Sequence, residues 1–169
     1  MGLSFYTVDI AYCTYLRNID SKVPDNSGHK SNRPFIGVVL EIDGVHYYAP
    51  LTSPKPKHLQ MKNQPDFHKI NGGVWGAINF NNMIPVPQNC LHPVDLKIYP
   101  TDSKADKDYK NLMIDQITWC SANASILLKK AAKLRQLVVN AAEENILTKR
   151  CCDFSALEQA CQNYNVVCV

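Results

Sequence analysis

The chain has 169 residues, with 18 Lys and Arg against 15 Asp and Glu, and a formal net charge of +3. This length fits one domain with a substantial core, and the composition, 46% hydrophobic and 20% charged, is that of an ordinary globular protein rather than a disordered chain. The mildly basic balance permits a polyanionic partner without requiring one. With no apolar run of about 18 residues and no signal-peptide pattern at the start, we expect a single cytoplasmic domain over residues 1–169 with no membrane association.

The seven cysteines form no C-x-x-C pair. An odd number of cysteines without a signal peptide predicts reduced thiols, and apolar surroundings predict that they are buried. The five histidines are scattered along the sequence. We therefore expect neither a metal site nor a cofactor.

The first element is a predicted strand over residues 4–8, rich in aromatic and β-branched side chains. Asp9 is a suitable cap for a short helix, in which Ile10, Cys13 and Leu16 fall on related turns. A polar stretch over residues 20–33, with Pro24 and Gly28, is predicted to be a long loop. Loops of that length in compact domains are usually functional or disordered.

A β-hairpin is predicted next, because residues 35–42 read as a strand, Asp43 and Gly44 as its turn, and residues 45–49 as the partner strand. Residues 59–73 are polar and show no clear period. One or two further strands are expected over residues 74–80 and 83–86.

The second half changes character, with apolar residues at helical spacing over residues 104–122 and 125–148. A last short helix is expected after Asp153, with a capping pattern formed by Ser155 and Glu158. Strands followed by helices predict an α+β domain with a largely antiparallel sheet.

The segment that leaves the hairpin carries the clearest chemical signal. Thr52 and Ser53 supply hydroxyls, Lys55 and Lys57 supply cations, and an imidazole follows at His58. Prolines 54 and 56 restrict the backbone between them. Such donors suit phosphate oxygens, so the segment is typical of a phosphate or nucleic-acid contact loop. A solvated, proline-braced turn is the alternative.

Several motifs, in this order, resemble the ToxN/AbiQ family of endoribonuclease toxins, which includes CptN-like members. They are Phe5-Tyr6-Thr7, Tyr12-x-x-Tyr15-Leu16, Lys22-Val23-Pro24, Arg33-Pro34-Phe35-Ile36-Gly37-Val38-Val39-Leu40, Tyr48-Ala49-Pro50-Leu51-Thr52-Ser53-Pro54-Lys55, Ala77-Ile78-Asn79-Phe80, Met83-Ile84-Pro85 and Cys152-Asp153-Phe154-Ser155. The resemblance covers nearly the whole chain, and its most specific part is the Pro-Leu-Thr-Ser-Pro-Lys segment after the hairpin.

This resemblance implies a twisted, mostly antiparallel sheet, related to the half-barrel of Kid/MazF-like toxins, with flanking C-terminal helices. It implies a toxin of a type III toxin–antitoxin system that cuts single-stranded RNA without a metal and leaves 2′,3′-cyclic phosphate ends. The implied substrates are cellular and phage mRNA. The implied antitoxin is an RNA pseudoknot, which the toxin processes from a repeat transcript and with which it forms a closed oligomer.

Residue by residue, the resemblance places Thr52, Ser53 and Lys55 in the active-site loop. Arg33 falls where relatives carry a basic residue, often Lys, and Tyr12 matches an aromatic residue of the active-site groove. These five are the expected catalytic residues. The expected RNA-binding residues are His29, which stands where some relatives have Tyr, together with Lys57, His58, Lys62, Lys69 and Asn79.

In the implied reaction, Lys55 and Arg33 would supply charge to the phosphate, while Thr52 and Ser53 would donate hydrogen bonds. The group that removes the 2′-hydroxyl proton is left open among Tyr12, His29, His58 and a water held by Ser53.

Other roles compete with these. Tyr12 could be a core residue, Thr52 and Ser53 could cap the loop, and lysines 57, 62 and 69 could form a solvated face. Trp75 and Trp119 are expected in the core. Two other functions remain open: a non-catalytic RNA-binding module on the same scaffold, and a module that binds an acidic peptide through the Lys/Pro loop.

Overall fold

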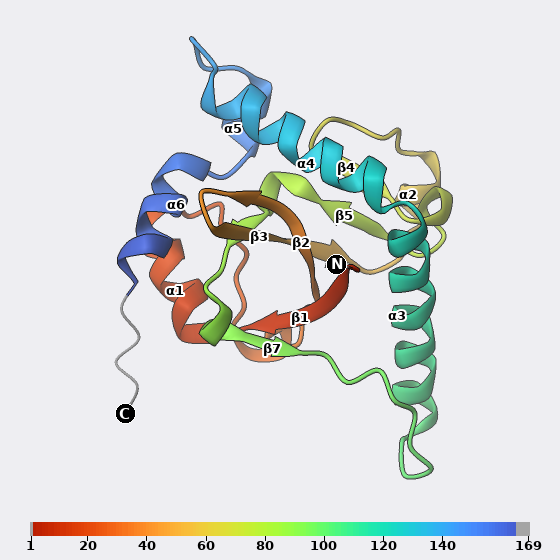
Figure 1. Ribbon diagram of the computed structural model, residues 1–169. Coiled ribbons are helices and arrows are strands. Elements are labelled where there is room, and N and C mark those ends of the chain that lie inside the picture. Colours follow the sequence, from red (N-terminus) through yellow and green to blue (C-terminus); the bar gives the residue numbers. More distant parts are fainter. Residues whose placement is uncertain (1, 165–169) are drawn as a thin grey trace.

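The computed structural model describes residues 2–164 and shows a twisted antiparallel sheet flanked by helices (Figure 1). The sheet has seven strands in the order β4-β5-β3-β2-β1-β7, and β6 pairs with β3 off this path. The strands are β1 (Ser4–Val8), β2 (Phe35–Ile42), β3 (Val45–Thr52), β4 (Phe67–Lys69), β5 (Ala77–Asn79), β6 (Ile84–Pro85) and β7 (Leu91–Pro93). The predicted α+β class with a mostly antiparallel sheet is confirmed.

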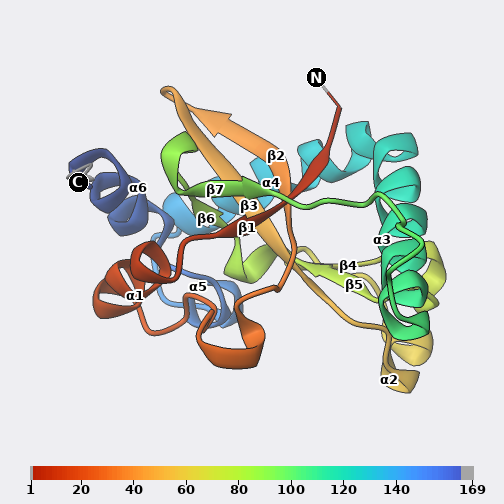
Figure 2. The same cartoon turned by 90° about the horizontal axis from the view of Figure 1, so that it is seen from below.

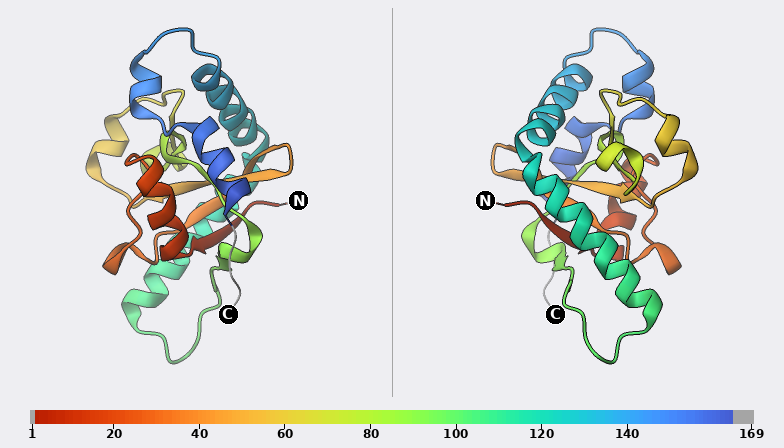
Figure 3. Two further views of the ribbon diagram at one scale, coloured as in Figure 1. Left: turned by 90° about the vertical axis from the view of Figure 1, so that its left-hand side faces the viewer. Right: turned by 90° about the vertical axis from the view of Figure 1, so that its right-hand side faces the viewer.

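Six α-helices surround this sheet within the described residues: α1 (Ile10–Ile19), α2 (Pro56–Gln60), α3 (Lys104–Ala122), α4 (Ala124–Val139), α5 (Ile146–Arg150) and α6 (Phe154–Asn163). Figure 2 shows α1 and α6 together at one end of the sheet and α3 at the other. Helix α4 packs against β2. In Figure 3 the connection into α3 and the first turns of that helix project beyond the rest of the molecule.

The β2–β3 hairpin forms the centre of the sheet. Asp43 and Gly44 turn the chain with φ values of 50° and 78°, as predicted for this pair. Strand β3 is longer than the predicted range over residues 45–49, because Leu51 and Thr52 pair with Ile78 and Ala77 of β5. The chemically rich segment therefore begins inside the sheet rather than in a loop.

The core lies between the sheet and the C-terminal helices. Phe35, Ile36 and Tyr47 from the hairpin have no exposed surface, and Leu127 of α4 and Phe154 of α6 are equally buried. Trp75 and Trp119 pack against this core at partial exposure, as expected. Burial of these side chains is the main force that holds the helices on the sheet.

The predicted helix over residues 125–148 is wrong in its second half. Helix α4 ends at Val139, and a new helix, α5, begins after Asn145. The Asn145 side chain accepts hydrogen bonds from the backbone N–H groups of Leu147 and Thr148, which caps α5 as a separate element. Asparagine at such a position competes with helix continuation through its own backbone contacts.

The structure differs from the sequence-based expectation in three other ways. Asp153, rather than Ser155, caps α6, because its carboxylate accepts from the Ala156 N–H. Residues 56–60 form the short helix α2 instead of a loop, with Pro56 in its first turn. Strands β4 and β7 were not predicted, since each has three residues and no hydrophobic alternation.

The cysteines behave as predicted within the described residues. Five of the six are buried, Cys161 is partly exposed and all six are free thiols, while Cys168 lies outside the described residues. Burial raises the pKa of Cys13 and Cys120 to about 12, which keeps both thiols protonated and unreactive. None of the helices in residues 2–164 combines the length and the apolarity that a membrane crossing needs.

Candidate active site

A cleft of about 400 Å³ lies where β3 leaves the sheet. Its walls come from the segment before β2, the end of β3, β5 and α3. The lining residues are Pro24, His29, Lys30, Asn32, Arg33, Pro34, Pro50, Leu51, Thr52, Ser53, Lys55, Asn79, Asn82 and Tyr109. The fold thus gathers the predicted Thr52–Lys55 segment, Arg33, His29 and Asn79 at one place.

The cleft is electropositive. Lys30, Arg33 and Lys55 contribute cations, and none of its described lining residues is Asp or Glu. The Lys30 ammonium lies 3.6 Å from the Asp25 carboxylate, and both side chains are 41% exposed, so this ion pair is weak. A polyanion entering the cleft would meet uncompensated positive charge.

Thr52 and Ser53 are placed by the sheet and by one glycine. Thr52 pairs with Ala77 across β3 and β5, while Ser53 is already exposed. Gly76 lies against this turn with φ +86°, and a Cβ built on it would come within 2.1 Å of the Thr52 carbonyl oxygen. Only glycine fits this approach and this backbone conformation, so residue 76 fixes where the hydroxyl-bearing turn sits.

Lys55 is held by the first turn of α2. Its backbone N–H donates to Nδ1 of His58 across 3.2 Å, and the His58 N–H donates to the Lys55 carbonyl across 2.9 Å. The His58 side chain is buried at 1% exposure, whereas Lys55 is exposed. Burial, together with the charges of Lys57 and Lys55, lowers the pKa of His58 and favours the neutral ring that this bond requires.

Arg33 stands beside the end of β3 because of backbone pairing. The Leu51 N–H donates to the Pro34 carbonyl across 3.1 Å, and Phe35 is in register with Pro50. Arg33 itself ends a tight turn in which its N–H donates to the Lys30 carbonyl across 3.0 Å. The long predicted loop therefore packs against the hairpin exit and brings the Arg33 guanidinium to the same cleft as Thr52.

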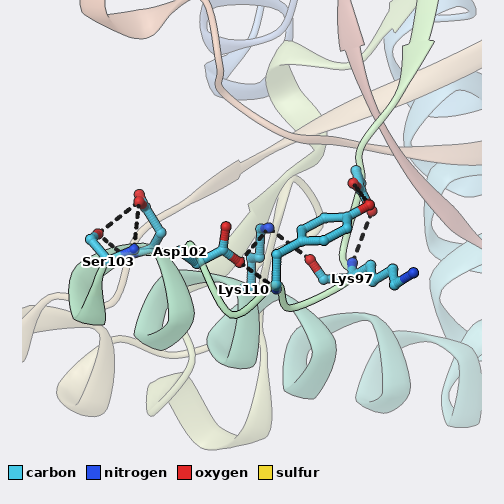
Figure 4. Close-up of polar contacts among 7 residues, drawn as sticks. Lys97, Asp102, Ser103 and Lys110 are labelled. Atoms are coloured by element: carbon cyan, nitrogen blue, oxygen red, sulfur yellow. Dashed lines mark hydrogen bonds and ion pairs between the residues drawn. The ribbon is translucent and has the colours of Figure 1, made fainter.

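Tyr109 is the aromatic residue that lines the cleft, and it was not predicted from the sequence because it lies on an amphipathic helix far from the hairpin. Its side chain is 42% exposed. Figure 4 shows polar contacts at the start of α3, among them those of Asp102, Ser103 and Lys110. The neighbouring Lys110 ammonium binds the Asp102 carboxylate at 2.8 Å and the Lys97 carbonyl at 2.7 Å, and Ser103 caps the helix by accepting from the Asp106 N–H.

The sequence matches the family described as toxin ToxN of type III toxin–antitoxin systems over residues 4–162. The chain belongs to the ToxN toxin family. Endoribonuclease ToxN of Bacillus thuringiensis subsp. kurstaki is 33% identical over 164 residues, covering 95% of this chain and 83% of that protein. Endoribonuclease ToxN of Pectobacterium atrosepticum is 32% identical and covers 96% and 94%. The predicted resemblance is therefore confirmed.

Solved ToxN-family structures share the fold. One, from work on selective toxin inhibition by a non-coding RNA pseudoknot, has a TM-score of 0.82 at 33% identity and covers 97% of this chain and 98% of that one. The structure of AbiQ, a lactococcal anti-phage endoribonuclease, has a TM-score of 0.79 at 26% identity, covering 96% and 97%. The whole described domain therefore has the family architecture.

Tyr12 is one expectation from the family resemblance that the structure contradicts. It has no exposed surface, and its hydroxyl donates to the Pro85 carbonyl across 2.7 Å. Its ring packs edge-on against Tyr164 at 4.8 Å. Burial raises the pKa of this phenol far above its usual value, so it neither touches RNA in this conformation nor acts as a base. Tyr12 is a core residue.

The remaining predicted RNA contacts are spread over a wider surface of this ToxN-family chain. Asn79 lines the cleft and also a second pocket beyond Lys55, which Lys57 lines as well. His58 belongs to that second pocket only as a buried wall, so its prediction as a direct contact is wrong. Lys62 and Lys69 line neither hollow, and Lys62 is exposed.

The described polar side chains of the cleft are mainly hydrogen-bond donors and cations and not a cluster of metal ligands. Within residues 2–164, no three or more His, Cys, Asp or Glu side chains are grouped as a metal site would need. The cleft instead offers hydroxyl, amide and cationic donors, of which Lys30, Asn32, Asn82 and Tyr109 were not predicted. No sequence motif indicated these four residues, because they lie in separate segments of the chain and only the fold shows which segments meet.

Proposed function

We propose that this ToxN-family toxin is an endoribonuclease that cuts single-stranded RNA in the cleft around Thr52, Ser53 and Lys55, leaving a 2′,3′-cyclic phosphate without using a metal. One observation carries the proposal. Hydrogen-bond donors and cations from three separate segments, 29–33, 52–55 and 79–82, line one cleft that has no carboxylate among its described lining residues. Such donors stabilise the negative charge that develops on a phosphodiester in the transition state of cleavage.

The names of the relatives support the chemistry. The similar proteins from Bacillus thuringiensis and Pectobacterium atrosepticum are named endoribonucleases, and so is AbiQ of Lactococcus lactis, which is 28% identical over 98% of this chain. These alignments span the segments that build the cleft. We assign the same activity to this chain.

The reaction follows from the donors present. The 2′-oxygen attacks phosphorus and forms a new P–O bond, the bond to the 5′-oxygen breaks, the 2′-hydroxyl loses a proton and the leaving 5′-oxygen gains one. Negative charge grows on the non-bridging oxygens. Lys55 and Arg33 offset it, while Thr52 and Ser53 donate hydrogen bonds, each such donor being worth roughly 10²–10³ in rate.

His29 is the group we assign to the 2′-hydroxyl proton. It is exposed and lies in the cleft wall, and an imidazole nitrogen can accept a proton from a hydroxyl that it contacts. Tyr12 and His58, the other side chains considered for this role, are buried and already committed to the Pro85 carbonyl and the Lys55 N–H. Arg33 cannot act as a base near neutral pH, so it acts by charge and geometry.

Tyr109 adds a surface for a base. A half-exposed ring at the edge of an electropositive cleft is the usual stacking platform for an unpaired nucleotide. Stacking tolerates any base, so this contact holds single-stranded RNA without itself fixing the sequence that is cut.

The same cleft is the proposed site of inhibition. One solved relative comes from work on toxin inhibition by a non-coding RNA pseudoknot, and another from work on a processed non-coding RNA that regulates an antiviral system, the latter with a TM-score of 0.79 at 31% identity. We propose that this chain likewise processes its own repeat RNA, and that the pseudoknot product stays in the cleft within a closed toxin–RNA oligomer. Cellular and phage mRNA are the proposed substrates of the released toxin.

The test is cleavage and growth inhibition by single-site variants. Lys55→Ala and Ser53→Ala should each lower cleavage by at least about 100-fold while leaving the unfolding temperature unchanged, because both side chains are exposed. Lys129→Ala is the matched control, an exposed lysine on α4 that lines no part of the cleft. Folded variants that bind RNA and cut it at the wild-type rate would contradict the proposal. RNA binding without any cleavage by the wild-type protein would identify a binding module instead.

A further inference from the structure

A second pocket of about 350 Å³ adjoins the cleft. The two hollows share Thr52, Lys55 and Asn79, so Lys55 stands on the ridge between them. The second pocket receives two further cations, Lys57 from α2 and Arg150 from the end of α5. Nothing in the sequence connects Arg150 with the hairpin exit, since about a hundred residues separate them.

Arg150 is held in place by a buried carboxylate. Its Nη2 lies 2.8 Å from Oδ1 of Asp66, whose side chain is only 6% exposed, whereas the Arg150 side chain is 46% exposed. The backbone around Asp66 is also fixed, because its carbonyl accepts from the Asn81 N–H across 3.1 Å. A buried acid that contacts a half-exposed guanidinium holds it in position, and this contact uses only part of the five N–H donors of the Arg150 side chain.

The charge balance of this pocket favours an anion. Asp66 is its single acidic residue among those described, and Arg150 already pairs with it. Lys55 and Lys57 remain as exposed cations. A phosphate entering the pocket would therefore meet two ammonium groups and the free edge of a guanidinium.

The other wall of the pocket is apolar and aromatic. The half-buried Phe67 ring lies 5.9 Å from the buried His58 ring, and Met61 lines the same side. A cation cluster facing an aromatic wall matches the two halves of a nucleotide, a phosphate and a base. The pocket volume is also within the usual range for small-molecule sites.

We propose that this second pocket binds the nucleotide next to the scissile phosphate in single-stranded RNA. Arg150 contacts its phosphate, Asp66 positions Arg150, and the Phe67 side of the pocket contacts its base. The inference rests on the proposed ribonuclease function, and it adds a nucleotide subsite with a phosphate ligand from α5. It accounts for an ion pair that joins α5 to the loop before β4 at the rim of the RNA path.

The experiment uses the full chain made inactive by Ser53→Ala, so that RNA stays intact. The probes are an RNA that spans a cut site mapped with the active protein and the two shorter RNAs that end at that site. Arg150→Ala should weaken binding of the spanning RNA about tenfold and of one shorter RNA similarly, and it should leave the other unchanged. For the spanning RNA, the slope of the logarithm of the binding constant against the logarithm of the salt concentration should become shallower by about 1, as expected for the loss of one phosphate contact.

Two further variants separate this role from a structural one. Asp66→Asn combined with Arg150→Gln removes both charges and so leaves no unpaired carboxylate in the interior, and it should lose the same affinity in a protein that thermal unfolding shows to be folded. Lys149→Ala is the matched control, because that lysine is the preceding residue of α5, is 63% exposed and lines neither hollow. It should bind all three RNAs like the parent protein.

Wild-type affinity and salt slope in both Arg150→Ala and the double variant would overturn the inference. The proposed function would survive that result, provided that the active protein still cuts RNA. If the protein without the Ser53→Ala change neither binds nor cuts RNA, both the proposed function and the nucleotide subsite are refuted. The two failures are therefore distinguishable.

Discussion

Lys55 and His58 are joined by two hydrogen bonds, one from the Lys55 N–H to His58 Nδ1 at 3.2 Å and one from the His58 N–H to the Lys55 carbonyl at 2.9 Å. The pair closes the turn that leads from β3 into α2 and leaves the Lys55 side chain exposed at the cleft. His58 was expected to contact RNA, but its buried ring instead supports Lys55, which we propose to contact the RNA phosphate. The His58 ring must be neutral at Nδ1, because a protonated nitrogen cannot accept.

Acid should destabilise the fold through the partly buried imidazole of His68. Burial, aided by the Lys130 ammonium 3.1 Å from Nδ1, lowers the pKa of His68 to about 4. A lowered pKa in the folded state means that the unfolded chain binds the proton first. Stability is then complete above the ordinary histidine pKa of roughly 6.5 and is lost as pH falls toward about 4.

Thermal unfolding from pH 7.5 to 4.5 measures this effect. His68→Asn keeps an acceptor for Lys130 but does not titrate, so its unfolding temperature should fall less over this range than that of the parent. Equal slopes for the two proteins would show that His68 does not contribute.

Gly76→Ala should disable the hydroxyl-bearing turn. The new Cβ would lie 2.1 Å from the Thr52 carbonyl oxygen at a φ of +86°, so the 52–54 backbone must move. We expect a cost of about 3 kcal/mol or more from strain and overpacking combined, and loss of most RNA cleavage.

Gly72→Ala is the matched control for that variant. It has φ +62° but nothing within 4 Å of its Cβ position, so it should cost only about 1–2 kcal/mol and keep cleavage at temperatures where it is folded. Urea unfolding and cleavage rates check both variants. Similar losses in the two would mean that the contact with Thr52 is unimportant.

Tyr109 should contribute through its ring and not its hydroxyl. Tyr109→Ala removes a stacking surface worth roughly 1–3 kcal/mol per base, which corresponds to about 5- to 150-fold weaker RNA binding. Tyr109→Phe should bind like the parent protein. Titration of inactive protein with labelled single-stranded RNA measures both, and weak binding by the Phe variant would assign the role to the hydroxyl instead.

Tyr12→Phe should affect stability and spare activity. The change leaves the buried Pro85 carbonyl without its donor, which costs about 1–2 kcal/mol. Because the Tyr12 ring has no exposed surface, RNA cleavage below the unfolding transition should match the parent. If a folded Tyr12→Phe protein cleaved RNA about 100-fold more slowly than the parent, Tyr12 would have a catalytic role and this prediction would be wrong.

The predictable part of this structure is the local part. The Asp43–Gly44 turn, the strand at 35–42 and the helix over 104–122 follow from turn chemistry and periodicity, which act between near neighbours. The candidate site was predictable where its residues are contiguous, as in Thr52, Ser53 and Lys55, which line one cleft. Such signals require no knowledge of the distant chain.

The unpredicted part depends on distant segments. Tyr12 matched a groove aromatic by position in the sequence, yet the packing of α1 against α6 buries it. Tyr109 and Arg150 reach the hairpin exit only because α3 and α5 fold back beside it. Residues 59–73 lack periodicity, and β4 forms there because β5 supplies its hydrogen bonds.

The most direct test of the central claim is cleavage of a mapped RNA in the presence of EDTA, beside the same RNA with one 2′-deoxy nucleotide at the cut site. If the cleft acts through its own donors on a 2′-hydroxyl nucleophile, the all-RNA strand is cut at the normal rate to a 2′,3′-cyclic phosphate and a 5′-hydroxyl. The substituted strand then stays intact. Loss of cleavage in EDTA, or cutting of the 2′-deoxy strand at the same bond, would contradict the account.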